Sequence, residues 1–253
     1  MRCSAAEDLK AGREIRMSRV FIVPDVHLKP WMFAKATELI KKGDYDRVVF
    51  LGDLVDDWNQ EMNLDLYRET FEAIYTFLGE FPDTLYCIGN HDISYVWQAF
   101  ESGYSAFARD IVCEGMNRIR YMLPEENVAF IHRIGSTLFS HAGLTERFVR
   151  QNFGRGPRLE IDELLTQVND LDRDILWKDD SPIWARPQSQ YEPQSLYPWD
   201  MFQVVGHSPV EKPQLDGKML TLDTFSTFRN GTPIGDEKFV WVDAETGEYR
   251  YAE

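Results

Sequence analysis

Short apolar runs alternate with stretches of helical periodicity along the first part of the chain. The runs at 20–23, 48–51 and 84–88 are rich in apolar residues and predict strands that are covered on both faces. Between them, residues 31–42 and 62–79 carry apolar side chains at the spacing of a helix that buries one face. Strands that alternate with helices predict a parallel sheet with right-handed crossovers. The ends of the three strands would then lie along one edge of that sheet.

The rest of the chain predicts further helices followed by more strands. Residues 94–117 and 145–176 have a mostly helical pattern, and the second range is interrupted by two glycines. The ranges 128–134 and 137–140 predict an antiparallel pair around a glycine turn. Further short strands are expected at 202–205 and near 218–222, 238–243 and 248–252.

Residues 177–200 follow neither pattern, because prolines and aromatic residues are interspersed there. A loop of this length inside a compact domain is usually functional or disordered, and its aromatic residues favour an ordered loop packed over another part of the protein. The Trp and Tyr rings could stack on a nucleobase, although packing of the loop is the commoner use. We expect residues 18–253 to form one domain that includes this loop, after a flexible tail at 1–17.

Composition narrows the classes of partner. Lys and Arg number 27 against 42 Asp and Glu, which gives a formal net charge of −15. This balance argues against tight binding to a nucleic-acid duplex or to an anionic membrane. Three well-separated cysteines form neither a disulfide framework nor a zinc knuckle, and no apolar run approaches the ~18 residues of a membrane span. The N-terminal residues lack the apolar stretch of a signal peptide, so we expect free thiols and a cytoplasmic location.

Four of the five histidines occur in one type of position. His27, His91, His141 and His207 each follow a predicted strand and have Gly, Asp or Asn nearby in the sequence. His132 is the exception, since it lies inside a strand, and we interpret it as a surface or packing residue. Each histidine alone is more often structural than a ligand, so the hypothesis of a shared site depends on the four together.

Oxygen donors accompany these histidines at the same strand ends, namely Asp25, Asp53 and Asn90. An aspartate in a turn is by itself often a capping residue. Imidazole, carboxylate and amide oxygen together suit divalent metals such as manganese, iron, zinc or nickel. The four histidines and three oxygen donors make seven candidates, more than one ion needs. Two ions with a bridging carboxylate would use them, as in sites that clamp both oxygens of an in-line displacement at phosphorus.

Five short motifs in a fixed order resemble those of the calcineurin-like metallophosphoesterase superfamily. They are D-x-H at 25–27, G-D-x-x-D at 52–56, G-N-H-D at 89–92, S-H-A-G at 140–143 and G-H-S-P at 206–209. Each motif is weak alone, but the ordered set is specific, and the resemblance covers residues 19–243. It implies an α/β fold in which a β-sandwich of mixed sheets is flanked by helices. A dinuclear metal site would lie at the strand tips.

The resemblance also implies which residues would bind the metals. Asp25 and His27 would bind the first ion, and Asp53 would bridge both. The second ion would be held by Asn90, His141 and His207. We expect two divalent ions, manganese first, with iron, zinc or nickel as alternatives.

The remaining motif residues would carry the chemistry. By the resemblance, His91 would donate a proton to the leaving oxygen, and Asp56 would hold its imidazole in orientation. Asn90 and His91 would contact the substrate phosphate. The nucleophile would be a hydroxide on the metals, formed because their charge lowers the pKa of water.

The motifs depart from the commonest pattern at three places. Many members of the superfamily end in G-H-x-H, whereas here the last position is Pro209. This brings the chain closer to the branch that holds bacterial serine/threonine protein phosphatases and diadenosine tetraphosphatases. Leu28 and Asp57-Trp58 stand where that branch usually has Gly and Arg-Gly, so the subfamily stays open.

The arginine that is missing at this motif normally contacts the substrate phosphate, and Arg186 is a candidate replacement. It lies in a Trp-x-Arg stretch similar to one in bacterial relatives, and a guanidinium binds phosphate oxygens bidentately. The alternative is a solvated surface arginine. Arg155 and Arg158 are weaker candidates for the same contact.

The sequence therefore predicts an enzyme that hydrolyses a phosphate monoester on a small molecule or a phosphoprotein. Hydrolysis of a phosphodiester or of a diadenosine polyphosphate is the second hypothesis. A non-catalytic metal-binding scaffold is a third, although every expected catalytic position is filled. The pattern does not indicate an oligomeric state.

Overall fold

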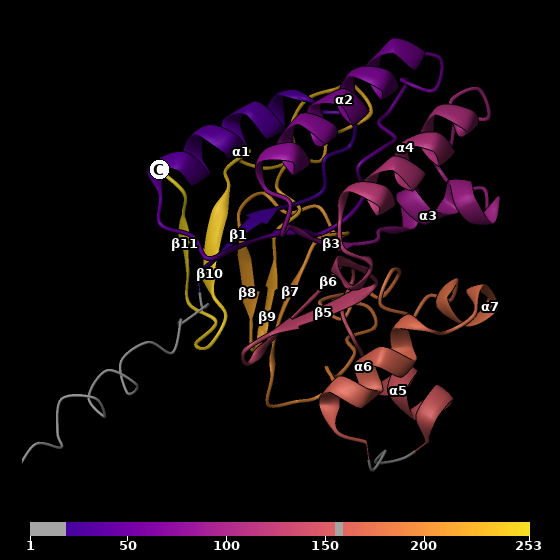
Figure 1. Ribbon diagram of the computed structural model, residues 1–253. Helices are drawn as coiled ribbons and strands as arrows, with labels where there is room; N and C mark the ends of the chain where they lie inside the picture. Colours follow the sequence, from indigo (N-terminus) through magenta and orange to yellow (C-terminus); the bar gives the residue numbers. More distant parts are fainter. Residues whose placement is uncertain (1–18, 155–158) are drawn as a thin grey trace, which may run out of the picture.

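The structure is a computed structural model that describes residues 19–154 and 159–253, and it contains two mixed β-sheets with helices outside them (Figure 1). This arrangement confirms the predicted α/β fold of mixed sheets flanked by helices. The tail expected at 1–17, together with Arg155 and Arg158, lies outside the described residues.

The first sheet contains the three strands whose ends were expected to meet. Its order is β11-β10-β1-β2-β3-β4. The central strands β1 (Arg19–Val23), β2 (Arg47–Phe50) and β3 (Leu85–Cys87) are parallel neighbours, so the residues that follow them share one edge. The other strands are β4 (Val128–Ala129), β10 (Val240–Asp243) and β11 (Tyr249–Tyr251).

The second sheet has the order β5-β6-β7-β9-β8. Its strands are β5 (Ile131–Ile134), β6 (Thr137–Ser140), β7 (Phe202–Val205), β8 (Gln214–Asp216) and β9 (Met219–Thr221). Because β6, β7 and β9 run parallel, the residues that follow them also lie at one edge.

Seven α-helices lie outside the sheets in the described part of the chain. They are α1 (Trp31–Lys42), α2 (Leu64–Glu80), α3 (Asn90–Trp97), α4 (Arg109–Met122), α5 (Glu146–Phe153), α6 (Ile161–Asn169) and α7 (Arg173–Leu176). In Figure 1, α1 to α4 gather on one side of the strands and α5 to α7 on another. Phe33 of α1, Phe50 of β2 and Phe77 of α2 pack with ring centroids 5.4–5.7 Å apart, which fixes α1 and α2 on the first sheet.

The alternating faces of β1 and β2 divide the core into two layers. Val20, Ile22 and Val49 are fully buried with residues of the second sheet such as Phe139 and Val204. The intervening residues of the same strands belong to the layer under the helices. Burial on both faces explains why these strands are continuous apolar runs in the sequence.

Three sequence-based assignments in this part were incomplete or wrong. The predicted helix 94–117 is two helices, α3 and α4, separated by a loop over 98–108. Residues 128–129 do not extend the antiparallel pair, because they form β4 and pair in parallel with β3. The edge strand β8 was missed, since its residues are all exposed and carry no apolar alternation.

The proline- and aromatic-rich loop 177–200 packs only partly. Trp177 and Trp184 contact each other edge to face with centroids 5.0 Å apart, and both pack against the main core. Tyr191 is fully exposed and Trp199 is 81% exposed, so packing accounts for only some of these rings. None of the described helices combines the length and apolar character needed to cross a bilayer.

His132 is a buried packing residue. Its Nε2–H donates to the backbone carbonyl of Tyr86 at 3.1 Å, and burial lowers the pKa of His132 to about 4. The unfolded chain would take up this proton near the ordinary value of 6.5, so folding favours the neutral imidazole. The stability that this site contributes is therefore fully present above pH 6.5 and is lost as the pH falls towards 4.

We predict that His132→Gln removes one component of acid sensitivity. Between pH 6.5 and pH 4, the free energy of unfolding of the wild type should fall by up to roughly 3 kcal/mol more than that of the variant. The glutamine keeps a hydrogen-bond donor but cannot take up a proton. Urea unfolding of the two metal-depleted proteins at several pH values measures this difference. Parallel pH dependences would contradict the assignment.

Candidate functional site

Loops from both sheets bring the strand-end motifs together. Asp25 and His27 follow β1, and Asp53 follows β2, while α3 begins at Asn90 just after β3. His141 follows β6 and His207 follows β7. The loops are joined by backbone hydrogen bonds, such as those from the N–H groups of Val26 and His27 to the carbonyl of Asp53, both 2.9 Å. The expected residues therefore converge although they span most of the chain.

Several of these residues hold a left-handed backbone. The φ angles are +44° at His27, +48° at Asp53, +66° at Asp56 and +63° at His207. Residues other than glycine rarely adopt this region, and such strain concentrates at functional sites. These turns direct the four side chains toward the same cavity.

Two motif glycines are required by close approach. A Cβ at Gly89 would lie 2.2 Å from Oδ1 of Asp53, and one at Gly206 would lie 2.0 Å from Oδ2 of Asp25. Any larger residue would displace these carboxylates. Backbone N–H groups bind them as well: His91 donates to Oδ1 of Asp53 at 3.0 Å, and His207 donates to Oδ1 of Asp25 at 2.8 Å.

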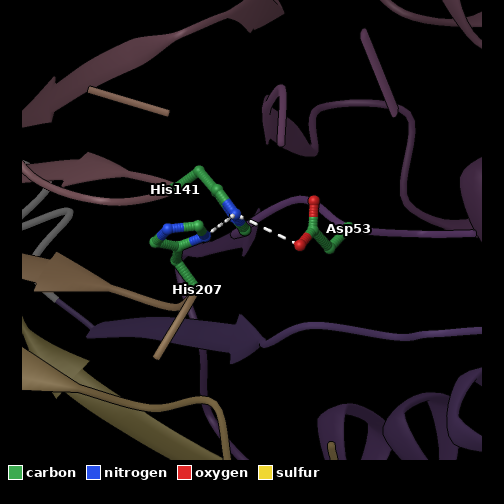
Figure 2. Close-up of side chains that lie close together, drawn as sticks. All are labelled: Asp53, His141 and His207. Atoms are coloured by element: carbon green, nitrogen blue, oxygen red, sulfur yellow. Dashed lines mark hydrogen bonds and ion pairs between the residues drawn. The ribbon is translucent and has the colours of Figure 1, made fainter. Parts of the chain in front are cut away.

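Potential ligand atoms form two groups that have Asp53 in common. One consists of Asp25, His27 and Asp53, and the other of Asp53, His141 and His207 (Figure 2). Within each group the ligand atoms lie within 4.8 Å of one another. Asn90 joins the second group, because its Oδ1 lies 2.8 Å from Nε2 of His141.

Two histidines are held with one ring nitrogen ready to bind a cation. Nδ1 of His27 donates to the carbonyl of Asp56 at 2.7 Å, and Nδ1 of His141 donates to the carbonyl of Leu51 at 2.8 Å. Since a carbonyl only accepts, Nε2 of each ring is left for the site. Nε2 of His141 lies 3.2 Å from Oδ2 of Asp53, so a proton or a metal ion must lie between these two atoms. A metal ion can take the place of that proton.

Buried atoms without a partner support the same fit. Oδ2 of Asp25 and Nε2 of His207 are buried and have no hydrogen-bond partner among the described residues. Imidazole nitrogen with carboxylate and amide oxygen is a donor set for a divalent transition metal. The residues present therefore fit metal ions.

The electrostatics centre on Asp53. Burial alone would raise the pKa of Asp53, but the imidazoles of His141, His91 and His27 hold it far below its usual range. Burial would likewise lower the pKa of His141, and the Asp53 carboxylate raises it to about 9. Burial and the neighbouring His141 push the pKa of His207 well down. The Asp53 carboxylate is thus stabilised as an anion by the histidines around it.

His91 and Asp56 form a hydrogen-bonded pair beside the ligand groups. Nδ1 of His91 lies 3.1 Å from Oδ2 of Asp56. The other oxygen of Asp56 accepts hydrogen bonds from the hydroxyls of Tyr67 and Tyr95, so the carboxylate is held on both sides. Burial would lower the pKa of His91, but Asp53, Asp56 and Glu101 raise it to about 10.

A cavity of about 340 Å³ opens beside both the ligand groups and this pair. Arg186 lines it, and its Nη1 donates to the carbonyl of His207 and to Oγ of Ser208, both at 2.9 Å. These bonds fix the guanidinium near the expected ligands. Arg186 therefore lies at the site, and its contact with a phosphate group stays a prediction.

The residues that replace the usual Arg-Gly pair face another loop. Asp57 accepts a hydrogen bond from Oγ1 of Thr227 at 2.7 Å and pairs with Lys29 at 3.4 Å. The indole N–H of Trp58 donates to the carbonyl of Thr227 at 2.9 Å, and Arg229 lies over the indole ring at 4.8 Å. They connect the 57–58 turn to the segment after β9 and line the cavity wall.

Sequence reasoning missed several residues of the site. Asp92 links two motif loops by accepting from the N–H groups of Leu54 at 2.7 Å and Gly89 at 3.0 Å. Asp223 is buried and lines the cavity. Both could have been found, because Asp92 lies in the G-N-H-D motif and Asp223 follows a predicted strand. Tyr67, Tyr95 and Glu101 carry no such signal.

Comparison with known proteins identifies the same family as the sequence motifs do. The family model for the calcineurin-like phosphoesterase matches residues 18–224. The fold is similar to a cold-active protein-tyrosine phosphatase of a psychrophilic Shewanella species, with a TM-score of 0.55, 16% identity and coverage of 94% of this chain and 81% of that one. It is also similar to a Saccharomyces cerevisiae protein serine/threonine phosphatase with similarity to human PP5, with a TM-score of 0.54, 16% identity and coverage of 91% and 74%. No curated protein matches the chain.

We predict that Gly89→Ala weakens metal binding by at least tenfold, because the added methyl group would displace the Asp53 carboxylate. Gly79→Ala is the matched control, since a Cβ there meets nothing within 4 Å on α2. The control should bind metal normally and gain up to about 1 kcal/mol of stability. Calorimetric titration of the chelated proteins with manganese measures the affinities. Equal affinities in two folded variants would contradict the role of this close approach.

Proposed function

The chain belongs to the calcineurin-like phosphoesterase family, and we propose that it hydrolyses phosphate monoesters with the help of two divalent ions. The observation that carries this proposal is the pair of ligand groups sharing Asp53, set beside a histidine–aspartate pair in one cavity. A metal-binding scaffold without catalytic activity would not need the histidine–aspartate pair. The cavity volume suits a small phosphorylated molecule or a single phosphorylated side chain.

The metal-binding residues would divide as the two groups do. Asp25 and His27 would hold one ion, Asp53 would contact both, and the second would be held by Asn90, His141 and His207. The chemistry that two such ions supply is polarisation of a phosphoryl oxygen and activation of water. Manganese, iron, zinc and nickel all suit this donor set.

The proton donor would be His91. Asp56 binds Nδ1, which leaves Nε2 on the cavity side to give its proton to the leaving oxygen. The hydroxyls of Tyr67 and Tyr95 keep Asp56 in place. Orientation of His91 therefore depends on a chain of buried hydrogen bonds that needs no substrate.

The phosphate group would be bound by groups around this donor. Nδ2 of Asn90 and Nε2 of His91 are donors on one side of the cavity. The guanidinium of Arg186 lies on the side of His207 and can bind phosphate oxygens with its remaining N–H groups.

We place the protein in the cytoplasm and expect neither a nucleic-acid duplex nor a membrane as its partner.

The test of this function is hydrolysis of p-nitrophenyl phosphate and bis-p-nitrophenyl phosphate after chelation, with manganese then restored. We expect activity that depends on the added metal and favours the monoester. A higher rate with the diester would support the phosphodiesterase or dinucleotide hypothesis instead. Absence of metal-dependent hydrolysis of either ester would contradict the proposal.

We predict that His91→Asn binds metal normally but loses turnover by a factor of roughly 10²–10⁴ with an alkyl phosphate, whose leaving oxygen must be protonated. The loss should be smaller with p-nitrophenyl phosphate, because nitrophenolate departs without a proton. The ratio of the two losses distinguishes the acid role from a binding role. Equal losses with both esters would remove His91 from that role.

A further inference from the structure

The loop between α3 and α4 covers one side of the His91–Asp56 pair. A Cβ at Gly103 would lie 3.3 Å from Cβ of Asp56 and 3.9 Å from Cε1 of His91, so the loop backbone passes directly over the pair. Tyr104 stacks on Tyr95 with centroids 4.4 Å apart, and the N–H of Ser105 donates to the Tyr95 hydroxyl at 2.8 Å. The loop is thereby attached to the helix that carries His91.

Glu101 of this loop lines the cavity and contacts the residues of the site. The Glu101 side chain is 8% exposed, and its Oε2 accepts a hydrogen bond from Nδ2 of Asn90 at 2.6 Å. The same oxygen lies 3.8 Å from Nε2 of His91. The other oxygen, Oε1, is buried without a hydrogen-bond partner among the described residues.

These two nitrogens are the donors that the proposed function assigns to the substrate. Nδ2 of Asn90 would contact the phosphate, and Nε2 of His91 would give its proton to the leaving oxygen. A carboxylate oxygen and a phosphate oxygen are both anionic acceptors, so they can satisfy the same donors but cannot occupy the same position. Their like charges also repel at short range, because the largely buried Glu101 carboxylate is poorly screened by water.

We propose that Glu101 competes with the phosphate group of the substrate for Asn90 and His91, and so limits the affinity of the site for phosphoryl groups. This inference rests on the proposed function. When a phosphate monoester enters, the Glu101 carboxylate gives up its hydrogen bond from Nδ2 of Asn90 and moves away from Nε2 of His91. Nε2 of His91 then faces the leaving oxygen in place of Glu101.

The Glu101 carboxylate can be displaced because few hydrogen bonds hold it in place. Only Oε2 has a hydrogen bond, while the buried Oε1 has none. A buried carboxylate with one unpaired oxygen is poorly stabilised where it stands. The exposed neighbours Phe100 and Ser102 show that the loop surface is open to solvent next to this residue, so the side chain has water close by.

The experiment compares wild type with Glu101→Gln and Glu101→Ala. The glutamine keeps an acceptor for Asn90 and removes the charge, whereas alanine removes both. Glu69→Gln, at an exposed position of α2, is the control for a change of one net charge. Calorimetry measures the binding of inorganic phosphate to each manganese-loaded protein, and a separate titration measures manganese affinity.

We expect phosphate to bind several-fold more tightly to Glu101→Gln and roughly tenfold more tightly to Glu101→Ala, with KM for p-nitrophenyl phosphate falling in parallel. Glu69→Gln should match wild type. If Glu101→Ala also loses manganese, Glu101→Gln decides, because it retains the contact to Asn90. Phosphate affinity that is unchanged or weaker in Glu101→Gln would overturn the inference.

The outcome can be separated from a failure of the proposed function. Normal hydrolysis by wild type, with unchanged phosphate affinity in the variants, would reject the role of Glu101 alone. Absence of metal-dependent hydrolysis in every protein would reject the proposed function, and the inference with it.

Discussion

The buried carboxylate of Asp53 is the group around which the site is organised. Its Oδ1 accepts the backbone N–H of His91, while its Oδ2 lies 3.2 Å from Nε2 of His141 and 3.9 Å from Nε2 of His27. An isolated buried anion would be strongly destabilising, so these neighbours are required as much by electrostatics as by chemistry. The same carboxylate belongs to both ligand groups, which ties the two halves of the site together.

The fold supplies this arrangement by bringing strand ends from two sheets to one place. The central strands are buried on both faces, so their polar residues can only appear where the strands end. The close contacts of Gly89 and Gly206 with carboxylates then set the distance between neighbouring loops. Helices contribute from outside, as Tyr67 of α2 and Tyr95 of α3 both reach Asp56.

The sequence predicted most of this arrangement, and its failures have physical causes. Helix 31–42 and the parallel strands were visible because their periodicity matches burial on one or two faces. The break at 98–108 was not, because the loop is held by tertiary contacts such as the stacking of Tyr104 on Tyr95. The candidate metal-binding residues stood out as polar residues after apolar runs. Glu101 did not, because it lines the cavity from an irregular loop, and its position depends on packing rather than on local pattern.

The most direct test of the account is whether two ions share Asp53. Manganese-loaded wild-type protein, analysed for metal content and by electron paramagnetic resonance, should contain two ions per chain with the spectrum of an exchange-coupled pair. Asp53→Asn should lose the coupled spectrum and at least one ion, because a neutral amide is a poor bridge between two cations. A single bound ion in wild type, or a coupled pair that persists in Asp53→Asn, would contradict the shared carboxylate on which the proposed function depends.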